Sequence, residues 1–232
     1  MVAEEIEVYR ALDCKTRVDV LGQLYTGPKD LREIAAALSI GPFTARYHLE
    51  ALEEGGLVSK SEGRGGRGRP RVLYRLGGSP VLLTIPRRQY LALGVGIIST
   101  LESMLGQEGS REVMRRTGYQ EGKRLLGESA TKHQVGAWTV DSFRRYFLDG
   151  ALSELAGKPE TVDGRRAGRL VCRVYNCPVE ELARQFPEHV CEALENGFRE
   201  GLVESSQGRL CIERTKSMQG GDPCCEFEVG TV

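Results

Sequence analysis

Apolar residues recur at helical spacing through much of the first 54 positions. In the segment 31–38 they lie three or four residues apart on one face, and Asp30 stands where a helix cap is expected. A break at Gly41-Pro42 follows, and a second such segment, 43–54, ends at Gly55-Gly56. The pattern predicts two helices joined by a tight turn. Two further amphipathic helices are predicted before them, at 4–12 and 16–24.

Two short segments after these helices alternate between apolar and polar residues. Residues 57–60 and 71–76 have the period of two that is typical of strands, and a loop rich in arginine and glycine joins them. Helix, turn, helix and strand pair together resemble a winged helix-turn-helix. The segments 11–24 and 41–58 are also similar to those of ArsR-like and DeoR-like repressors, which implies binding to double-stranded DNA.

The second helix of the pair is expected to enter a DNA major groove. Its apolar face is needed for packing, which leaves the other side chains to meet base edges and phosphates. These side chains are Thr44, Arg46, Tyr47 and His48. The loop adds Arg64, Arg67, Arg69 and Arg71. Arg67-Gly68-Arg69-Pro70 resembles the core of an AT-hook, which implies minor-groove contact and A·T-rich flanks around a palindromic operator.

The second half of the chain mixes helical and strand patterns. Apolar residues of the segment 86–105 cover more than one face of a predicted helix, so this helix needs two partners. The second partner is either the same helix of another subunit, giving a symmetric homodimer, or the rest of its own domain. Further helices are predicted at 110–129, 140–149, 151–156, 179–185 and 187–202, and strands at 169–175, 208–214 and 224–229.

These elements predict an α+β protein in three parts. The flexible sequence Gly77-Gly78-Ser79-Pro80 is the natural boundary after the strand pair. We expect a winged helix-turn-helix at 1–76, a linker and dimerisation helix at 77–108, and an α+β sensor domain at 109–232. A chain of 232 residues is long enough for two modest domains, each with its own core.

Charge and composition narrow the function classes. The 32 Lys and Arg residues balance the 32 Asp and Glu residues, but the segment between the two predicted strands is locally basic, as nucleic-acid binding requires. No apolar run is long enough to span a membrane, and the first residues are acidic, unlike a signal peptide. We therefore expect a cytoplasmic protein. Because no nucleophile, base and orienting group can be assembled from the sequence, we expect no enzyme.

Six of the seven cysteines lie after Arg169. A structural disulfide framework is not expected in the cytoplasm, which leaves buried thiols, metal ligands or redox sensors. Any single cysteine is best interpreted as a core residue, because cysteine is among the most buried residue types. Six thiols beside turns and element ends together favour a functional site. Cys224 and Cys225 are adjacent on a predicted strand and point to opposite faces, so only one of them can face a shared site.

The C-terminal half resembles SufR-type iron–sulfur-sensing repressors. The resemblance lies in Asn176-Cys177-Pro178, Val190-Cys191 and Gly221-Asp222-Pro223-Cys224-Cys225. It implies a cysteine-rich domain that carries a [4Fe-4S] cluster behind the winged helix. The implied cluster ligands are Cys177, Cys191, Cys211 and Cys225, with Cys172 or Cys224 as substitutes.

The segment 213–227 is similar to the end of vinyl-reductase-like sensor domains. In members of that family that bind zinc, the ligand positions correspond to Cys191, Glu213, Lys216 and Cys225. Lys216 is not a thiolate, so a zinc site of this type is incomplete. The resemblance therefore implies the fold, with zinc or no metal as alternatives to the cluster.

These observations lead us to expect a homodimeric DNA-binding transcriptional regulator, a repressor by its resemblance, that senses iron–sulfur or redox status through cysteines of its C-terminal domain. Three alternatives remain open at this stage. The cysteines could form a thiol–disulfide switch, the domain could bind a small apolar effector, or zinc could have a structural role.

Overall fold

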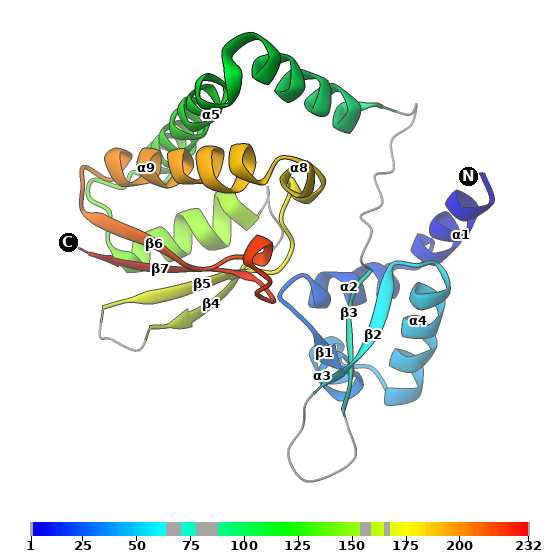
Figure 1. Ribbon diagram of the computed structural model, residues 1–232. Coiled ribbons are helices and arrows are strands. Elements are labelled where there is room, and N and C mark those ends of the chain that lie inside the picture. The colour runs from blue at the N-terminus through cyan, green and yellow to red at the C-terminus, as the bar shows by residue number, and fades with distance from the viewer. Residues whose placement is uncertain (1, 64–70, 78–87, 154–158, 165–167, 232) are drawn as a thin grey trace. The chain divides into compact units, whose positions relative to one another are not determined.

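The computed structural model describes residues 2–63, 71–77, 88–153, 159–164 and 168–231. The chain divides into two units, Met1–Ile85 and Pro86–Val232. Each unit combines helices with antiparallel strands, which confirms the predicted α+β class (Figure 1). Within the described residues, no helix is both long enough and apolar enough to cross a membrane.

The N-terminal unit has the predicted order of helices and strands. Its elements are α1 (Val2–Leu12), α2 (Lys15–Leu24), β1 (Lys29–Asp30), α3 (Leu31–Leu38), α4 (Pro42–Glu54), β2 (Val58–Gly63) and β3 (Arg71–Leu76). The strands form an antiparallel sheet in the order β1-β3-β2, and β1 is a two-residue strand that the sequence did not predict. The core consists mainly of aliphatic side chains from the helices, including Val20, Leu24, Ile34, Leu49 and Leu52.

The C-terminal unit packs helices against one face of a four-stranded sheet. Its helices are α5 (Tyr90–His133), α6 (Val140–Ser142), the π-helix η1 (Phe143–Leu152), α8 (Glu180–Gln185), the π-helix η2 (Glu188–Leu194), α9 (Glu195–Ser205) and the 3₁₀ turn η3 (Met218–Gly220). Its strands are β4 (Glu160–Asp163), β5 (Leu170–Val174), β6 (Leu210–Lys216) and β7 (Cys225–Thr231), in the antiparallel order β4-β5-β7-β6. Of these strands, the sequence did not predict β4.

The helices of this unit are longer and less regular than the sequence suggests. The predicted helices 86–105 and 110–129 run together as α5, with a kink at Gly106, whose φ of 70° is outside the helical region. The predicted helix 187–202 is a π-helical segment, η2, that continues into α9. After the kink, the buried Ser110 hydroxyl lies 2.8 Å from the Nε2 atom of His189 on η2.

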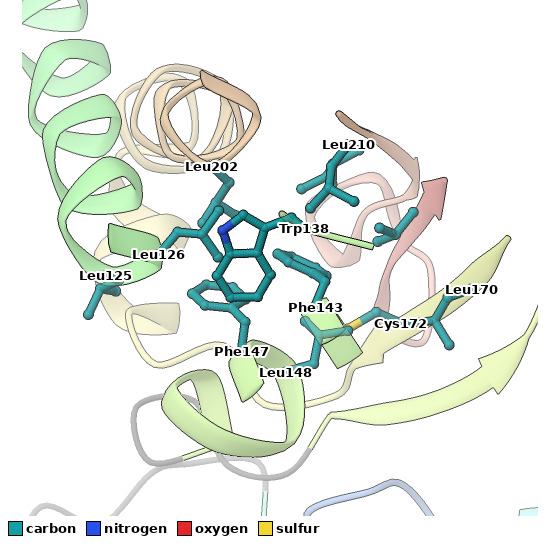
Figure 2. Packing of buried hydrophobic residues seen from close by; sticks show 12 residues of the cluster. Leu125, Leu126, Trp138, Phe143, Phe147, Leu148, Leu170, Cys172, Leu202 and Leu210 are labelled. Carbon is teal, nitrogen blue, oxygen red and sulfur yellow. The ribbon is translucent and has the colours of Figure 1, made fainter. Parts of the chain in front are cut away.

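Aromatic side chains from η1 form the centre of the C-terminal core. Phe143 and Phe147 stack with their ring centroids 4.9 Å apart, and the single tryptophan, Trp138, packs edge-on against Phe143 (Figure 2). Leu126 of α5 and Leu202 of α9 meet this aromatic group from the helical layer. Trp138 is therefore a core residue, and its fluorescence reports on the C-terminal unit alone.

Helices α5 and α9 cross with their backbones in contact. Glycines on both helices make this possible, since a Cβ atom at Gly118 would overlap the carbonyl oxygen of Leu194. In the same way, a Cβ atom at Gly197 would overlap the carbonyl oxygen of Arg115. Only glycine can occupy these positions without moving one helix away from the other.

We expect Gly118→Ala to lower the free energy of unfolding of the C-terminal unit by about 3 kcal/mol, at the upper end of typical overpacking costs. Gly127→Ala is the matched control, because a Cβ atom there would meet nothing closer than the Ser205 hydroxyl at 4.0 Å. The control should be neutral or more stable by up to about 1 kcal/mol. Urea unfolding followed by Trp138 fluorescence measures both variants. Equal unfolding midpoints would contradict the close crossing.

Candidate functional site

The exposed face of α4 begins at its first turn. Gly41 precedes the helix, Pro42 occupies its first position, and Ala45, Leu49 and Leu52 are fully buried on its inner side. The opposite side exposes three of the side chains selected from the sequence. These are Thr44, Arg46 and Tyr47.

His48 does not join this exposed face. Its side chain is buried beside the apolar residues of α4, and burial followed by the positive charge of Arg17 lowers its pKa below the ordinary value. Among the described residues, its Nδ1 atom has no hydrogen-bond partner. A neutral, buried imidazole is poorly placed to reach a base edge, so the structure corrects the prediction for this residue. The prediction counted His48 among the side chains left over from the apolar face, and helical spacing alone does not show that this position is buried near Arg17.

Asp30 fixes the start of α3 and the base of the strand pair together. Its carboxylate accepts a hydrogen bond from the backbone N–H of Glu33 at 2.9 Å, and the Glu33 carboxylate accepts one from the backbone N–H of Asp30 at 2.7 Å. Arg71 at the start of β3 donates to the same Asp30 carboxylate. Burial alone would raise the pKa of Asp30, but these hydrogen bonds and the charge of Arg71 lower it below its usual range.

A basic cleft of about 780 Å³ lies between α4 and the strands. Arg46 and Arg71 line it, as do Arg32 and Lys60, which the sequence did not single out as contact residues. Asp30 and Glu50 also line the cleft, so the cations outnumber the acids. The other predicted contact residues, Arg64, Arg67 and Arg69, lie outside the described residues.

The C-terminal unit contains a separate cavity of about 320 Å³ between the helices and the sheet. Most of its lining is apolar and comes from α5, η1, η2, α9 and strands β5 to β7. Four cysteines line it, namely Cys172, Cys177, Cys191 and Cys225. Three of them are cluster ligands predicted from the sequence, and Cys172 is one of the two predicted substitutes.

The predicted ligand Cys211 is directed to the other side of the sheet. Ile212 and Arg214 of β6 line the cavity, and successive side chains of a strand point to opposite faces, so Cys211 between them is directed away from it. The thiol of Cys211 instead lies 3.8 Å from the carboxylate of Glu213, which lines a charged groove on the outer face of the sheet. The predicted cluster ligand Cys211 is therefore separated from the other three.

The zinc positions implied by the vinyl-reductase-like resemblance are also divided by the sheet. Cys191 and Cys225 line the cavity, whereas Glu213 and Lys216 line the outer groove. Cys224 is buried but does not line the cavity, in agreement with the expectation that only one of the adjacent cysteines faces a shared site. Within the described residues, no group of three or more His, Cys, Asp or Glu side chains is arranged closely enough to hold a metal ion.

The cavity thiols are protonated at neutral pH. Burial raises the pKa of Cys172 to about 12 and that of Cys177 to about 11. Burial also raises the pKa of Cys191 and Cys225, and the interaction of Cys177 with both of these thiols raises its pKa further. Arg214 acts in the opposite direction on Cys191 and Cys225. A soft metal would have to displace these protons, whereas oxidation would first require a thiolate.

Arg214 also ties β6 to the helix that carries Cys191. Its guanidinium donates to the backbone carbonyl of Cys191 at 2.6 Å and to the carboxylates of Glu192 at 2.7 Å and Glu195 at 3.1 Å. Burial raises the pKa of Glu195, although Arg199 and Arg214 both lower it. The position of Cys191 is thus coupled to β6 by a network of charged hydrogen bonds.

Comparison with known proteins identifies the class of the N-terminal domain. Residues 14–60 match the family described as "Bacterial regulatory protein, arsR family". This match and the fold confirm an arsR-type winged helix-turn-helix domain at the N-terminus, the DNA-binding module of a transcriptional regulator. No curated protein matches the chain.

Several solved structures are similar to parts of the chain. A fragment of a possible transcriptional regulatory protein from Mycobacterium bovis has 25% identity over 44% of this chain and 94% of that chain, with a TM-score of 0.29. A solution structure of the homodimeric winged helix-turn-helix DNA-binding domain from the same organism has 25% identity, 44% and 81% coverage, and a TM-score of 0.30. The phenol-responsive sensory domain of the transcription activator PoxR has 18% identity, 68% and 80% coverage, and a TM-score of 0.43.

We expect Asp30→Asn to destabilise the N-terminal unit by removing the charge that pairs with Arg71, while keeping a side chain that can cap α3. The lowered pKa of Asp30 means that its charge contributes stability above the ordinary value of 3.8, and that this contribution is lost as the pH falls through the lower folded value. The difference between wild type and variant should therefore shrink below a pH of about 4.

Urea unfolding by far-UV circular dichroism measures this difference, with Trp138 fluorescence reporting the C-terminal unit separately. Asp30→Ala removes the cap as well and should cost about 1 kcal/mol more. Asp19→Asn, at an exposed position of α2, is the control and should be neutral. A constant gap between wild type and Asp30→Asn across this pH range would show that the pairing does not stabilise the fold.

Proposed function

We propose that this chain is a homodimeric transcriptional regulator whose affinity for DNA is set by the state of the thiols in the C-terminal cavity. The observation that carries the proposal is that Cys177, Cys191 and Cys225 face one cavity, although they come from three separate elements. Cys177 lies in the turn before α8, Cys191 on η2 and Cys225 at the start of β7. Any bond that joins these thiols also ties the three elements together.

An iron–sulfur cluster is the first chemistry that this site supports. Thiolates are the preferred protein ligands of such clusters, and three of the predicted ligands line the cavity. Cys172 lines the same cavity and is the available fourth thiol, whereas Cys211 is on the other face of the sheet. The described thiols are not arranged at metal-binding distances, so ligation would require η2 or the turn before α8 to move.

Oxidation of two of the thiols to a disulfide is the second chemistry. Cys177 is close enough to Cys191 and Cys225 for the negative charge of either neighbour, once ionised, to raise its pKa. The two thiols would lose two protons and two electrons to an oxidant such as a small-molecule disulfide. Because burial keeps the thiols protonated, this reaction should be slow at neutral pH and accelerate as the pH rises toward the thiol pKa values.

We expect a change in the state of these thiols to alter DNA affinity by about 5-fold to 150-fold, the usual range of coupling between two sites. Protein purified without oxygen is analysed for visible absorption, iron and labile sulfide, and its DNA affinity is compared in the reduced, oxidised and cluster-reconstituted forms. The variant Cys177→Ser with Cys191→Ser and Cys225→Ser should lose the response.

Cys211→Ser is the matched control, since this thiol is directed away from the cavity. It should respond like the wild type. Iron and labile sulfide that are retained by the wild type but not by the triple variant support the cluster. A mass lower by two hydrogen atoms in the oxidised protein, which is reversed by reduction, supports the disulfide. If DNA affinity is the same in all forms, the thiols do not control binding.

An apolar small molecule is a second candidate effector. The cavity of about 320 Å³ is lined mainly by side chains such as Leu148, Val174, Phe198 and Phe227, and apolar cavities of this kind take up small apolar ligands. Such an effector would not need the thiols, so it should stabilise the C-terminal unit of the triple serine variant as it does that of the wild type. Extraction and mass spectrometry of the purified protein would identify it.

The first half of α5 provides the surface for dimerisation. Ile98 is buried against α8 and η2, whereas Leu93, Ile97 and Met104 are more than half exposed. Together with Tyr90, these exposed residues recur at intervals of three, four and seven, the spacing of paired helices. Glu102 is the only charged residue between positions 90 and 105 and lies 3.6 Å from His189, on another side of the helix. An uncharged apolar stripe of this spacing can pack against the same stripe on a second copy of the helix.

We expect Leu93→Glu with Ile97→Glu to produce a monomer, because it places two charges on this stripe in each subunit. Light scattering after gel filtration measures the oligomeric state. The monomer should also bind DNA more weakly, because two half-sites about 34 Å apart require two coupled recognition helices. Ser99→Glu, on a different exposed side of α5, should remain dimeric. A dimeric double variant would place the interface elsewhere.

A further inference from the structure

Phe43 is the most exposed of the large apolar side chains described in the structure. Its side chain is 90% exposed on the first turn of α4, immediately after Pro42. Tyr47 follows one turn later and is 62% exposed. The sequence predictions for DNA contact included Tyr47 but not Phe43.

The exposed face of α4 changes in character along its length. Phe43, Tyr47, Glu50 and Glu54 lie on this face at intervals of three and four residues, opposite the buried Leu52. The first turn carries no acidic residue, whereas the second half carries Glu50, Glu53 and Glu54. DNA phosphates repel the acidic half and leave the N-terminal turn free to enter a groove more deeply. Phe43, on this first turn, would then be the side chain that reaches furthest into the groove.

A phenylalanine ring has a limited choice of partners on a base edge. It has no hydrogen-bond donor or acceptor, and the major-groove edges of the bases are polar except for the C5-methyl group of thymine. Arg46 lies on the neighbouring side of the helix and lines the basic cleft with Lys60 and Arg71. The cations are thus gathered on the side of α4 that faces the strands, and the aromatic residues occupy the tip.

We propose that Phe43, supported by Tyr47, reads thymine methyl groups in the major groove and so determines part of the operator sequence. This rests on the proposed function, since it requires that α4 enters DNA. The recognition is apolar, so it contributes to discrimination between sequences without adding to the salt dependence of binding.

Replacement of thymine by uracil in the operator tests the proposal. A duplex is first selected from a random library by the full-length wild-type protein, and each thymine is then replaced singly by uracil, which removes only the methyl group. We expect an affinity loss of about fourfold at one or two thymines in each half-site, as burial of one methyl group implies. Other thymines should tolerate the replacement.

Variants of α4 connect the effect to Phe43. Phe43→Ala should bind the thymine duplex more weakly and no longer distinguish it from the uracil duplex at the sensitive positions. Phe43→Leu keeps an apolar side chain and should remain sensitive. Glu54→Ala, on the same face but at the far end of α4, is the matched control and should distinguish the two duplexes as the wild type does. Because Phe43 is exposed, these changes should leave the unfolding midpoint unchanged.

The outcomes separate this inference from the proposed function. If the library yields no enriched sequence, the chain does not bind DNA specifically and both proposals are wrong. If the wild type binds a selected duplex but tolerates uracil at every position, only the proposed role of Phe43 is wrong. Equal sensitivity of Phe43→Ala and wild type would likewise overturn the assignment.

Discussion

The backbone contact between α5 and α9 is the constraint on which the C-terminal unit depends. Gly118 and Gly122 on α5 face Gly197 and Gly201 in the helical segment formed by η2 and α9, and a Cβ atom on any of them would overlap the opposing backbone. This contact fixes the axial position of α9 relative to α5. Gly118 also lines the thiol-bearing cavity, so the same crossing sets one wall of the site.

The π-helix η2 connects the α5–α9 contact to the cavity on one side and to the kink in α5 on the other. On one side, Arg214 from β6 binds the carbonyl of Cys191 and holds this thiol at the cavity. On the other side, the buried His189 contacts Ser110 after the kink in α5 and lies near Glu102 before it. A movement of η2 would therefore change both the cavity and the contacts at the kink in α5. The exposed stripe of the proposed dimer lies just before that kink.

The N-terminal unit depends on a charged hydrogen-bond network, as the link between β6 and η2 does. Asp30 caps α3 and pairs with Arg71, so a single buried carboxylate joins the helix pair to the strand that follows the arginine-rich loop. The prediction assigned Arg71 to DNA, and its pairing with Asp30 gives it a structural role as well. In both units, therefore, charged groups hold elements that are distant in sequence, and apolar residues fill the space between them.

The sequence by itself determined the elements whose signals are local. Residues 31–38 were predicted as a helix and 71–76 as a strand, and the structure has both with these bounds, because caps, breaks and periodicity act within a few residues. The winged helix-turn-helix order followed from the same signals, whereas the arsR-type class was suggested by the resemblance of the segments 11–24 and 41–58 to known repressors. The last two strands were predicted for a similar reason, although β6 begins and ends two residues later than the predicted 208–214, and β7 ends two residues after the predicted 224–229.

Only the tertiary structure decided which predicted site residues meet. His48 is buried because α4 turns that position toward Arg17. Cys211 is separated from the other predicted ligands because side chains alternate along β6 and its own points to the outer face. Cys172 lines the cavity because its side chain points to the inner face of the sheet from β5. Spacing along a chain does not specify the face of a strand or the packing of one helix on another, since both depend on residues far away in sequence. The thiol-bearing cavity is therefore a product of packing, whereas the helix that is expected to bind DNA is a product of local pattern.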